Sequence, residues 1–206
     1  MRYVAGCLFI LALVSCNQHD TKANVHLGNN KKPTVLLQPL GNISNENVEF
    51  LKDSIEIFYP VTTILAKQKQ PPSNAWYALR SRWRADSIIA WIRTNTPDTV
   101  RLTVGLMTDD ISATKGDIQD YGIMGLGYHP GKACVVSTFR LTKNMGSKET
   151  LKQRLFKVVA HEMGHNFGLP HCPNQHCIMV DAEGKMKLDG ERDLCNDCKQ
   201  KLKTLL

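Results

Sequence analysis

The sequence lacks a run of basic residues, an internal repeat and a low-complexity tract. Its 26 lysines and arginines exceed its 19 aspartates and glutamates, but the surplus is spread along the chain, which argues against nucleic-acid binding. Beyond the first residues, no stretch approaches the roughly 18 consecutive apolar residues that a transmembrane helix needs. With 206 residues, of which 42% are hydrophobic, the chain has the composition of one globular domain with its own core.

The apolar N-terminus has the pattern of an export signal. Arg2 supplies a positive charge, and residues 4–14 form an apolar run that is too short to span a bilayer. The run ends in Leu-Val-Ser-Cys at residues 13–16, which resembles the lipobox of bacterial lipoproteins, where the cysteine carries a lipid after cleavage. The pattern therefore indicates lipidation at Cys16. An ordinary signal peptide cut near Ser15, or an uncleaved anchor, is the alternative.

These features predict three parts along the chain. Residues 1–15 are expected to be a lipoprotein signal peptide, and residues 16–32, which are almost free of apolar side chains, a flexible tether. Residues 33–206 form the folded domain, with an N-terminal α/β part over 33–168 and a C-terminal subdomain over 169–206. The lipid would hold an exported monomer at a bacterial membrane, on the periplasmic side or at the cell surface.

Hydrophobic periodicity predicts an α/β fold. Apolar residues that alternate indicate strands, and apolar residues three and four apart indicate helices. The expected strands are 33–40, 61–65, 100–107 and 132–141. The expected helices are 45–58, 74–93 and a third that starts near residue 147 and ends at Gly168. The three tryptophans of the second helix are expected in core or half-core packing, and the glycine-rich segment 109–131 in a long, functional loop. Strands that alternate with helices favour an α/β sandwich with a mixed sheet.

The most specific pattern is His-Glu-x-x-His-x-x-Gly-x-x-His at the end of the third expected helix. His161 and His165 are four residues apart, so both imidazoles face the same side of a helix and can bind one metal ion. Glu162 lies beside the first of them, within reach of a metal-bound water. Gly168 permits the left-handed turn that ends the helix and brings back His171 as a third ligand. Three histidines leave a fourth position for water, as in catalytic zinc sites.

This pattern is that of the metzincin metalloproteases. Cys172 follows the third histidine directly, and Cys-Ile-Met at 177–179 and Cys-Asn-Asp-Cys at 195–198 come after it. With these residues the C-terminal third of the chain closely resembles the archaemetzincins. The resemblance implies a metzincin-like zincin fold with a mixed sheet, an active-site helix and a small zinc-stabilised C-terminal subdomain.

The resemblance also implies the role of each residue in the motif. His161, His165 and His171 would hold the catalytic zinc, and Glu162 would act as the general base. Met179 would form the Met-turn, which packs beneath the metal without binding it. The chain would then be an archaemetzincin-like zinc metalloprotease.

Four of the seven cysteines form two close pairs, Cys172 with Cys177 and Cys195 with Cys198. Their spacing suits a tetrahedral structural zinc, but exported cysteines usually oxidise. The spacing alone therefore leaves two disulfides, or one disulfide with free thiols, equally open. The resemblance implies a structural zinc at these positions, and hence two Zn²⁺ ions, one catalytic and one structural. Cys134 has no partner in the sequence and is expected as a small buried side chain on its strand.

The motif and the resemblance together predict zinc-dependent hydrolysis of peptide bonds in a peptide or protein substrate. Residues 134–141 resemble the active-site edge strand of the family, and the substrate would pair as an added strand with residues 133–140. Some metzincins carry a tyrosine just after the Met-turn that assists the oxyanion. No tyrosine follows Tyr128 in this sequence, so oxyanion stabilisation by that route is not expected. The alternative, of a different class, is a lipid-anchored, zinc-stabilised module that binds a peptide or partner without turnover.

Overall fold

The structure is a computed structural model, which describes residues 31–181, 188, 189 and 193–206. The α-helices are α1 (Asn45–Phe58), α2 (Ala85–Asn95), α3 (Lys148–Phe167) and α4 (Asn196–Leu205). The strands are β1 (Thr34–Pro39), β2 (Thr62–Leu65), β3 (Trp76–Tyr77), β4 (Arg82–Arg84), β5 (Leu102–Met107), β6 (Ile111–Lys115), β7 (Ile118–Ile123), β8 (Gly125–Gly127) and β9 (Ala133–Ser137). Short 3₁₀ turns are η1 (Ser73–Ala75), η2 (Ala78–Arg80) and η3 (Phe139–Thr142).

The expected signal peptide, the lipidation site Cys16 and the tether up to residue 30 lie outside the described residues. Within the described part of the chain, no helix combines the length and apolar character that crossing a membrane requires.

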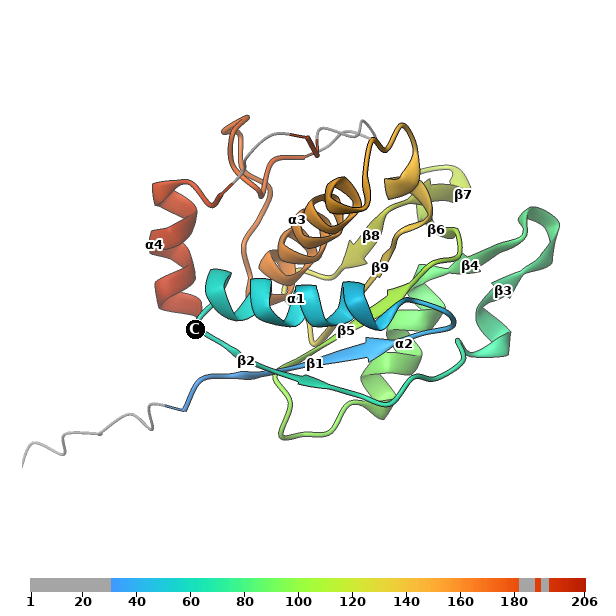
Figure 1. Ribbon diagram of the computed structural model, residues 1–206, viewed down its shortest axis with the longest axis horizontal. Helices are drawn as coiled ribbons and strands as arrows, with labels where there is room; N and C mark the ends of the chain where they lie inside the picture. Colours follow the sequence, from blue (N-terminus) through green and yellow to red (C-terminus); the bar gives the residue numbers. More distant parts are fainter. Residues whose placement is uncertain (1–30, 182–187, 190–192) are drawn as a thin grey trace, which may run out of the picture. The chain divides into compact units, whose positions relative to one another are not determined.

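The larger sheet has five strands in the order β2-β1-β5-β9-β8. Its first four strands are parallel, and β8 pairs antiparallel with β9 at one edge. Every residue of β5 and β9 is buried, as is typical of central strands that are covered on both faces. Helices α1 and α3 pack on one face and α2 on the other (Figure 1). The expected α/β sandwich with a mixed sheet is therefore confirmed.

Helices α1 and α3 begin close to the expected residues, each with a serine at its N-cap, and α3 ends at the expected glycine. The hydroxyl of Ser44 accepts a hydrogen bond from the N–H of Asn47, and that of Ser147 accepts one from Thr150. At the other end of α3, Gly168 adopts the left-handed conformation with φ +109° and ends the helix. This last feature positions the residues that follow α3.

The predicted helix over 74–93 is wrong in its first half. Residues 76–77 and 82–84 form the antiparallel strands β3 and β4, and α2 begins only at Ala85. Trp76 lies opposite Trp83 across this strand pair, with ring centroids 5.0 Å apart. A seven-residue separation that also fits a helix thus arises from cross-strand pairing. Trp83 and Trp91 are half-buried against the core, as expected, but Trp76 is 44% exposed.

The segment 109–131, predicted to be a loop, instead contains the strands β6, β7 and β8. The first two join β3 and β4 in a smaller sheet of order β3-β4-β6-β7, in which β6 pairs with β4 and β7 pairs with β6. Gly116 has φ +56° and closes the β6–β7 hairpin, so this glycine marks a tight turn. The smaller sheet is fixed by the buried carboxylate of Asp110, which lies 2.7 Å from the guanidinium of Arg82 and 2.8 Å from that of Arg140.

Candidate active site and metal centres

Two histidines from α3 and one from the turn that follows it converge on one point. The Nε2 atoms of His161 and His165 are 3.0 Å apart, and the ligand nitrogens of these two and His171 all lie within 4.8 Å of one another. A tetrahedral zinc with Zn–N bonds of about 2.05 Å separates its nitrogens by about 3.3 Å. His171 reaches this point because the chain reverses at Gly168. Its Nδ1 lies 3.6 Å from the carboxylate of Asp181.

The other ring nitrogens of the helical pair are held by backbone carbonyls. Nδ1 of His161 lies 2.8 Å from the carbonyl oxygen of Ile178, and Nδ1 of His165 lies 2.8 Å from that of Leu169. Donation from each Nδ1–H leaves the Nε2 lone pair free to bind a metal. Burial lowers the pKa of both imidazoles, that of His165 to about 4, which keeps them in the neutral form that ligates metals.

Glu162 is buried against the edge strand β8. The backbone N–H of Gly127 is hydrogen-bonded to its carboxylate, and burial raises its pKa to about 8. A Cβ on Gly125 would lie 2.9 Å from Cγ of Glu162, and a Cβ on Gly127 would lie 2.7 Å from the carbonyl oxygen of Glu162. Only glycine allows this close approach of strand and helix. Sequence reasoning missed both glycines, although a Gly-x-Gly in a segment of otherwise apolar residues is a signal for such an approach.

Met179 is fully buried next to the turn of α3 that carries His161 and His165, where the Met-turn was expected. A Cβ on Gly164 would overlap the Met179 sulfur and would lie 3.0 Å from its Cε. On the same side, the buried hydroxyl of Tyr59 donates a 2.7 Å hydrogen bond to the carbonyl of Ala160, the residue before the first histidine. Packing and this hydrogen bond together fix the turn that carries the histidines.

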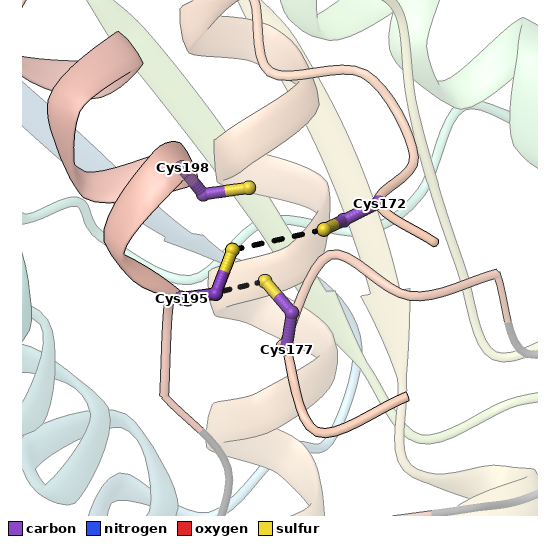
Figure 2. A group of neighbouring side chains, drawn as sticks. All are labelled: Cys172, Cys177, Cys195 and Cys198. Atoms are coloured by element: carbon purple, nitrogen blue, oxygen red, sulfur yellow. Dashed lines mark hydrogen bonds between the residues drawn. The ribbon is translucent and has the colours of Figure 1, made fainter. Parts of the chain in front are cut away.

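The four paired cysteines point toward a common centre (Figure 2). Cys172 and Cys177 come from the segment after α3, and Cys195 and Cys198 from the start of α4, a helix that the sequence did not predict. Their sulfurs all lie within 4.8 Å of one another, and those of Cys172 and Cys195 are 3.7 Å apart. Sulfurs around a tetrahedral zinc are about 3.8 Å apart, whereas a disulfide holds them at about 2.05 Å. The observed spacing fits the zinc geometry, and none of the four is disulfide-bonded.

The histidine and cysteine clusters share one segment of backbone. The N–H of Cys172 donates to the carbonyl of Met179 at 2.8 Å, while the carbonyl of Ile178 faces His161. The N–H of Ile178 donates to the carbonyl of Asp193 at 2.9 Å, just before the second cysteine pair. Ile178 and Met179 therefore connect the cysteine cluster to His161, and a displacement of the cysteines would also move the carbonyl that faces this histidine.

A cleft of about 1420 Å³ lies in front of Glu162 and the three histidines. Small-molecule pockets usually measure roughly 300–1,000 Å³, so the size favours a chain-like ligand. The prediction that residues 133–140 form its edge strand is wrong: β9 lies between β5 and β8, and β8 is the outer strand. The reason is burial, because the five apolar residues of β9 are covered on both faces. Cys134 on this strand is fully buried, as expected, and burial raises the pKa of its thiol.

Comparison with known proteins places these features in a family context. The model of peptidase family M54 matches residues 43–204. The archaemetzincin of Halobacterium salinarum is 31% identical over 175 residues, which cover 79% of this chain and 95% of that protein. The archaemetzincin of Haloarcula marismortui is 28% identical over 174 residues, with 79% and 95% covered.

Solved structures show the same likeness. The archaemetzincin of Archaeoglobus fulgidus, crystallised with malonate, matches with a TM-score of 0.69 and 25% identity over 82% of this chain and 99% of that one. The archaemetzincin of Methanopyrus kandleri matches with a TM-score of 0.73 over 86% of this chain and 97% of that one; at 22% identity this likeness concerns the fold.

Proposed function

The chain belongs to peptidase family M54, the archaemetzincins, and on this premise we propose that it hydrolyses peptide bonds with zinc bound by His161, His165 and His171 and with Glu162 as the general base. Membership of the family makes the chain a zinc metalloprotease with a zincin-like fold. The observation that carries the finer proposal is the convergence of three imidazole nitrogens beside a buried carboxylate in one cleft.

Zinc at the histidines would supply a Lewis acid that polarises the scissile carbonyl and acidifies a water in the open position. Glu162 would take the proton of the attacking water and pass it to the nitrogen of the leaving amine. The N–H of Gly127 holds the carboxylate in place for both transfers. The carbonyls of Ile178 and Leu169 keep the two helical imidazoles oriented.

The substrate would lie along the open edge of β8 as an added strand. The strand β8 contains two glycines, so its backbone is accessible to a peptide without side chains in between. This assigns to β8 the role that the sequence suggested for residues 133–140.

A second zinc, bound by Cys172, Cys177, Cys195 and Cys198, would stabilise the C-terminal subdomain. The support is the sulfur spacing, which suits four thiolates around one ion. Because the chain after α3 passes from the third histidine directly into the first of these cysteines, one structural ion would order the ligand of the other.

The N-terminal sequence supports export and lipidation at Cys16, which would attach a monomeric enzyme to a bacterial membrane. Expression of the full chain in a bacterium tests this point. The wild type should sediment with membranes, and Cys16→Ser should move it to the soluble fraction, whereas Cys7→Ser should leave it in the membrane. Equal partition of wild type and Cys16→Ser would overturn the lipid anchor.

Cleavage of a peptide library, followed by mass spectrometry, tests the enzymatic proposal. The wild type should cut peptides and bind zinc, and Glu162→Ala should bind zinc but lose about 10²-fold or more in rate, as expected for loss of a general base. Glu49→Ala, an exposed substitution on α1, is the matched control and should keep full activity. If the wild type and Glu162→Ala are equally inert although both bind peptide, the chain is the binding module, which family membership does not favour.

A further inference from the structure

Beyond the proposed catalytic residues, the cleft follows two successive strands that each lie at the edge of a sheet. The strands β7 and β8 are separated only by Met124, and each is the outer strand of its own sheet. Seven consecutive residues, Tyr121–Gly127, border the cleft, and the two strands that contain six of them are outer strands, so an open strand edge is among the surfaces that face the cleft. The cleft therefore runs along a continuous edge from the larger sheet to the smaller one.

The hydrogen bonds of this edge give a peptide a direction. The carbonyl of Met124 accepts from the N–H of Ser137 at 2.9 Å, so the backbone groups of Met124 face β9 and those of Gly125 and Gly127 face the cleft. A peptide that pairs antiparallel with β8 runs in the same direction as β9. The part of the peptide that follows the scissile bond would then leave the catalytic site past Gly125 and enter the part of the cleft that the smaller sheet borders.

Aromatic side chains line the cleft where it reaches the smaller sheet. Trp76 is 44% exposed and packs edge-on against Trp83, and Phe139 is 53% exposed. The indole N–H of Trp83 donates to the carboxylate of Asp109 at 3.1 Å, which fixes the ring at the side of the cleft. Apolar surface of this kind, rimmed by polar groups, is typical of binding sites.

The same side of the cleft carries two lysine ammonium groups that have no carboxylate partner within the described residues. The carboxylates of Asp110 and Asp120 are paired with Arg82, at 2.7 and 3.1 Å. Lys115 and Lys143 also border the cleft and are exposed, and within the described part of the chain neither forms an ion pair. An acidic partner would complement these two ammonium groups.

We propose that the aromatic-basic wall, formed by Trp76, Trp83, Lys115, Phe139 and Lys143, binds the substrate residues that follow the scissile bond and selects acidic side chains among them. The six residues of β7 span about 20 Å, so this part of the cleft would contact about six substrate residues. This inference rests on the proposed function, because it assigns a substrate class to the same cleft.

Cleavage-site profiling tests the proposal with a library of unstructured peptides. In the zinc-loaded wild type, aspartate and glutamate should be enriched over lysine and arginine by about 10-fold in the six positions after the cut, the size expected for two partly solvated ion pairs. Lys115→Glu/Lys143→Glu should abolish or invert this preference. The control Lys67→Glu/Lys201→Glu, with the same charge change at exposed residues outside the cleft, should retain it. Cleavage without acidic enrichment, or with enrichment only before the cut, overturns the proposed role of the aromatic-basic wall and leaves the peptidase function intact.

Binding gives a readout that does not depend on turnover. In the Glu162→Ala background, fluorescence anisotropy compares two labelled peptides of alanine, glycine and serine whose last six residues include three aspartates or three lysines. The aspartate peptide should bind about 10-fold more tightly, and Lys115→Glu/Lys143→Glu should remove the difference. Equal affinity overturns the proposal. Loss of cleavage in the wild type with this preference preserved would instead count against the peptidase function alone.

Discussion

The side chain of Met179 occupies the space that a Cβ on Gly164 would need. Alanine usually stabilises a helix relative to glycine by about 0.5–1 kcal/mol, but overpacking a core costs about 1–3 kcal/mol. We therefore expect Gly164→Ala to lower the free energy of unfolding by about 1 kcal/mol or more, measured by urea denaturation, and to weaken zinc binding. Gly146→Ala has no neighbour within 4 Å of the new Cβ and is the control. A stabilised Gly164→Ala protein would contradict the contact.

The cysteine cluster should control activity from a distance. Cys198→Ser removes one of four sulfurs and should lower the zinc content from two ions per chain toward one. Because Cys172 is hydrogen-bonded to Met179, next to the carbonyl that orients His161, peptidase activity should fall as well. Zinc content by atomic absorption and peptide cleavage measure the two effects. Cys134→Ala, at the buried thiol of β9, should keep both ions, and unchanged zinc and activity in Cys198→Ser would exclude the structural ion.

Gly127→Ala should displace the general base. The new Cβ would lie 2.7 Å from the Glu162 carbonyl oxygen and 3.2 Å from its carboxylate, so strand and helix must separate. Displacements of about 1 Å at a catalytic group cost about 10²-fold in rate, and we expect a loss of kcat of this order with zinc content unchanged. Gly146→Ala should retain its rate. A fully active Gly127→Ala enzyme would show that the approach of β8 to α3 is unimportant for catalysis.

The stability of the metal-free protein should depend on pH through Glu162. Burial raises its pKa from 4.5 to about 8, so between these values the folded protein keeps a proton that the unfolded chain has lost. The stabilisation is complete below pH 4.5 and is lost as the pH rises through about 8. Thermal unfolding of chelator-treated protein from about pH 6 to about pH 9 should show a falling Tm relative to Glu162→Gln, which carries no titrating group there. If the Tm of the two proteins changes with pH in the same way, Glu162 has the pKa of an ordinary carboxyl group.

The clustering of the three histidines could be predicted because their constraints are local. His161 and His165 share a helix face by spacing alone, and Gly168 needs a left-handed turn that brings back His171. The starts of α1 and α3, where a serine side chain caps each helix, likewise lie close to the expected residues. In each case the relevant interaction joins residues a few positions apart.

The edge strand and the smaller sheet could not be predicted because their determinants are distant in sequence. Trp76 and Trp83 fit a helical spacing, and only the pairing of β4 with β6, more than twenty residues on, makes their segment extended. The glycines of β8 look like loop residues until Glu162, from α3, is seen packed against them. The local pattern therefore located the clustered histidines, while the surroundings that shape the cleft depended on tertiary pairing.

The single residue between β7 and β8 makes the length of this segment part of the catalytic apparatus. Backbone groups of a strand alternate in direction, so inserting or deleting one residue near Met124 would turn Leu126 toward the cleft in place of its flanking glycines. The base would then face a leucine side chain, and its hydrogen-bond donor would point into the sheet. A substitution along this edge alters one position, but a change in its residue count shifts every position of the proposed peptide-binding edge at once.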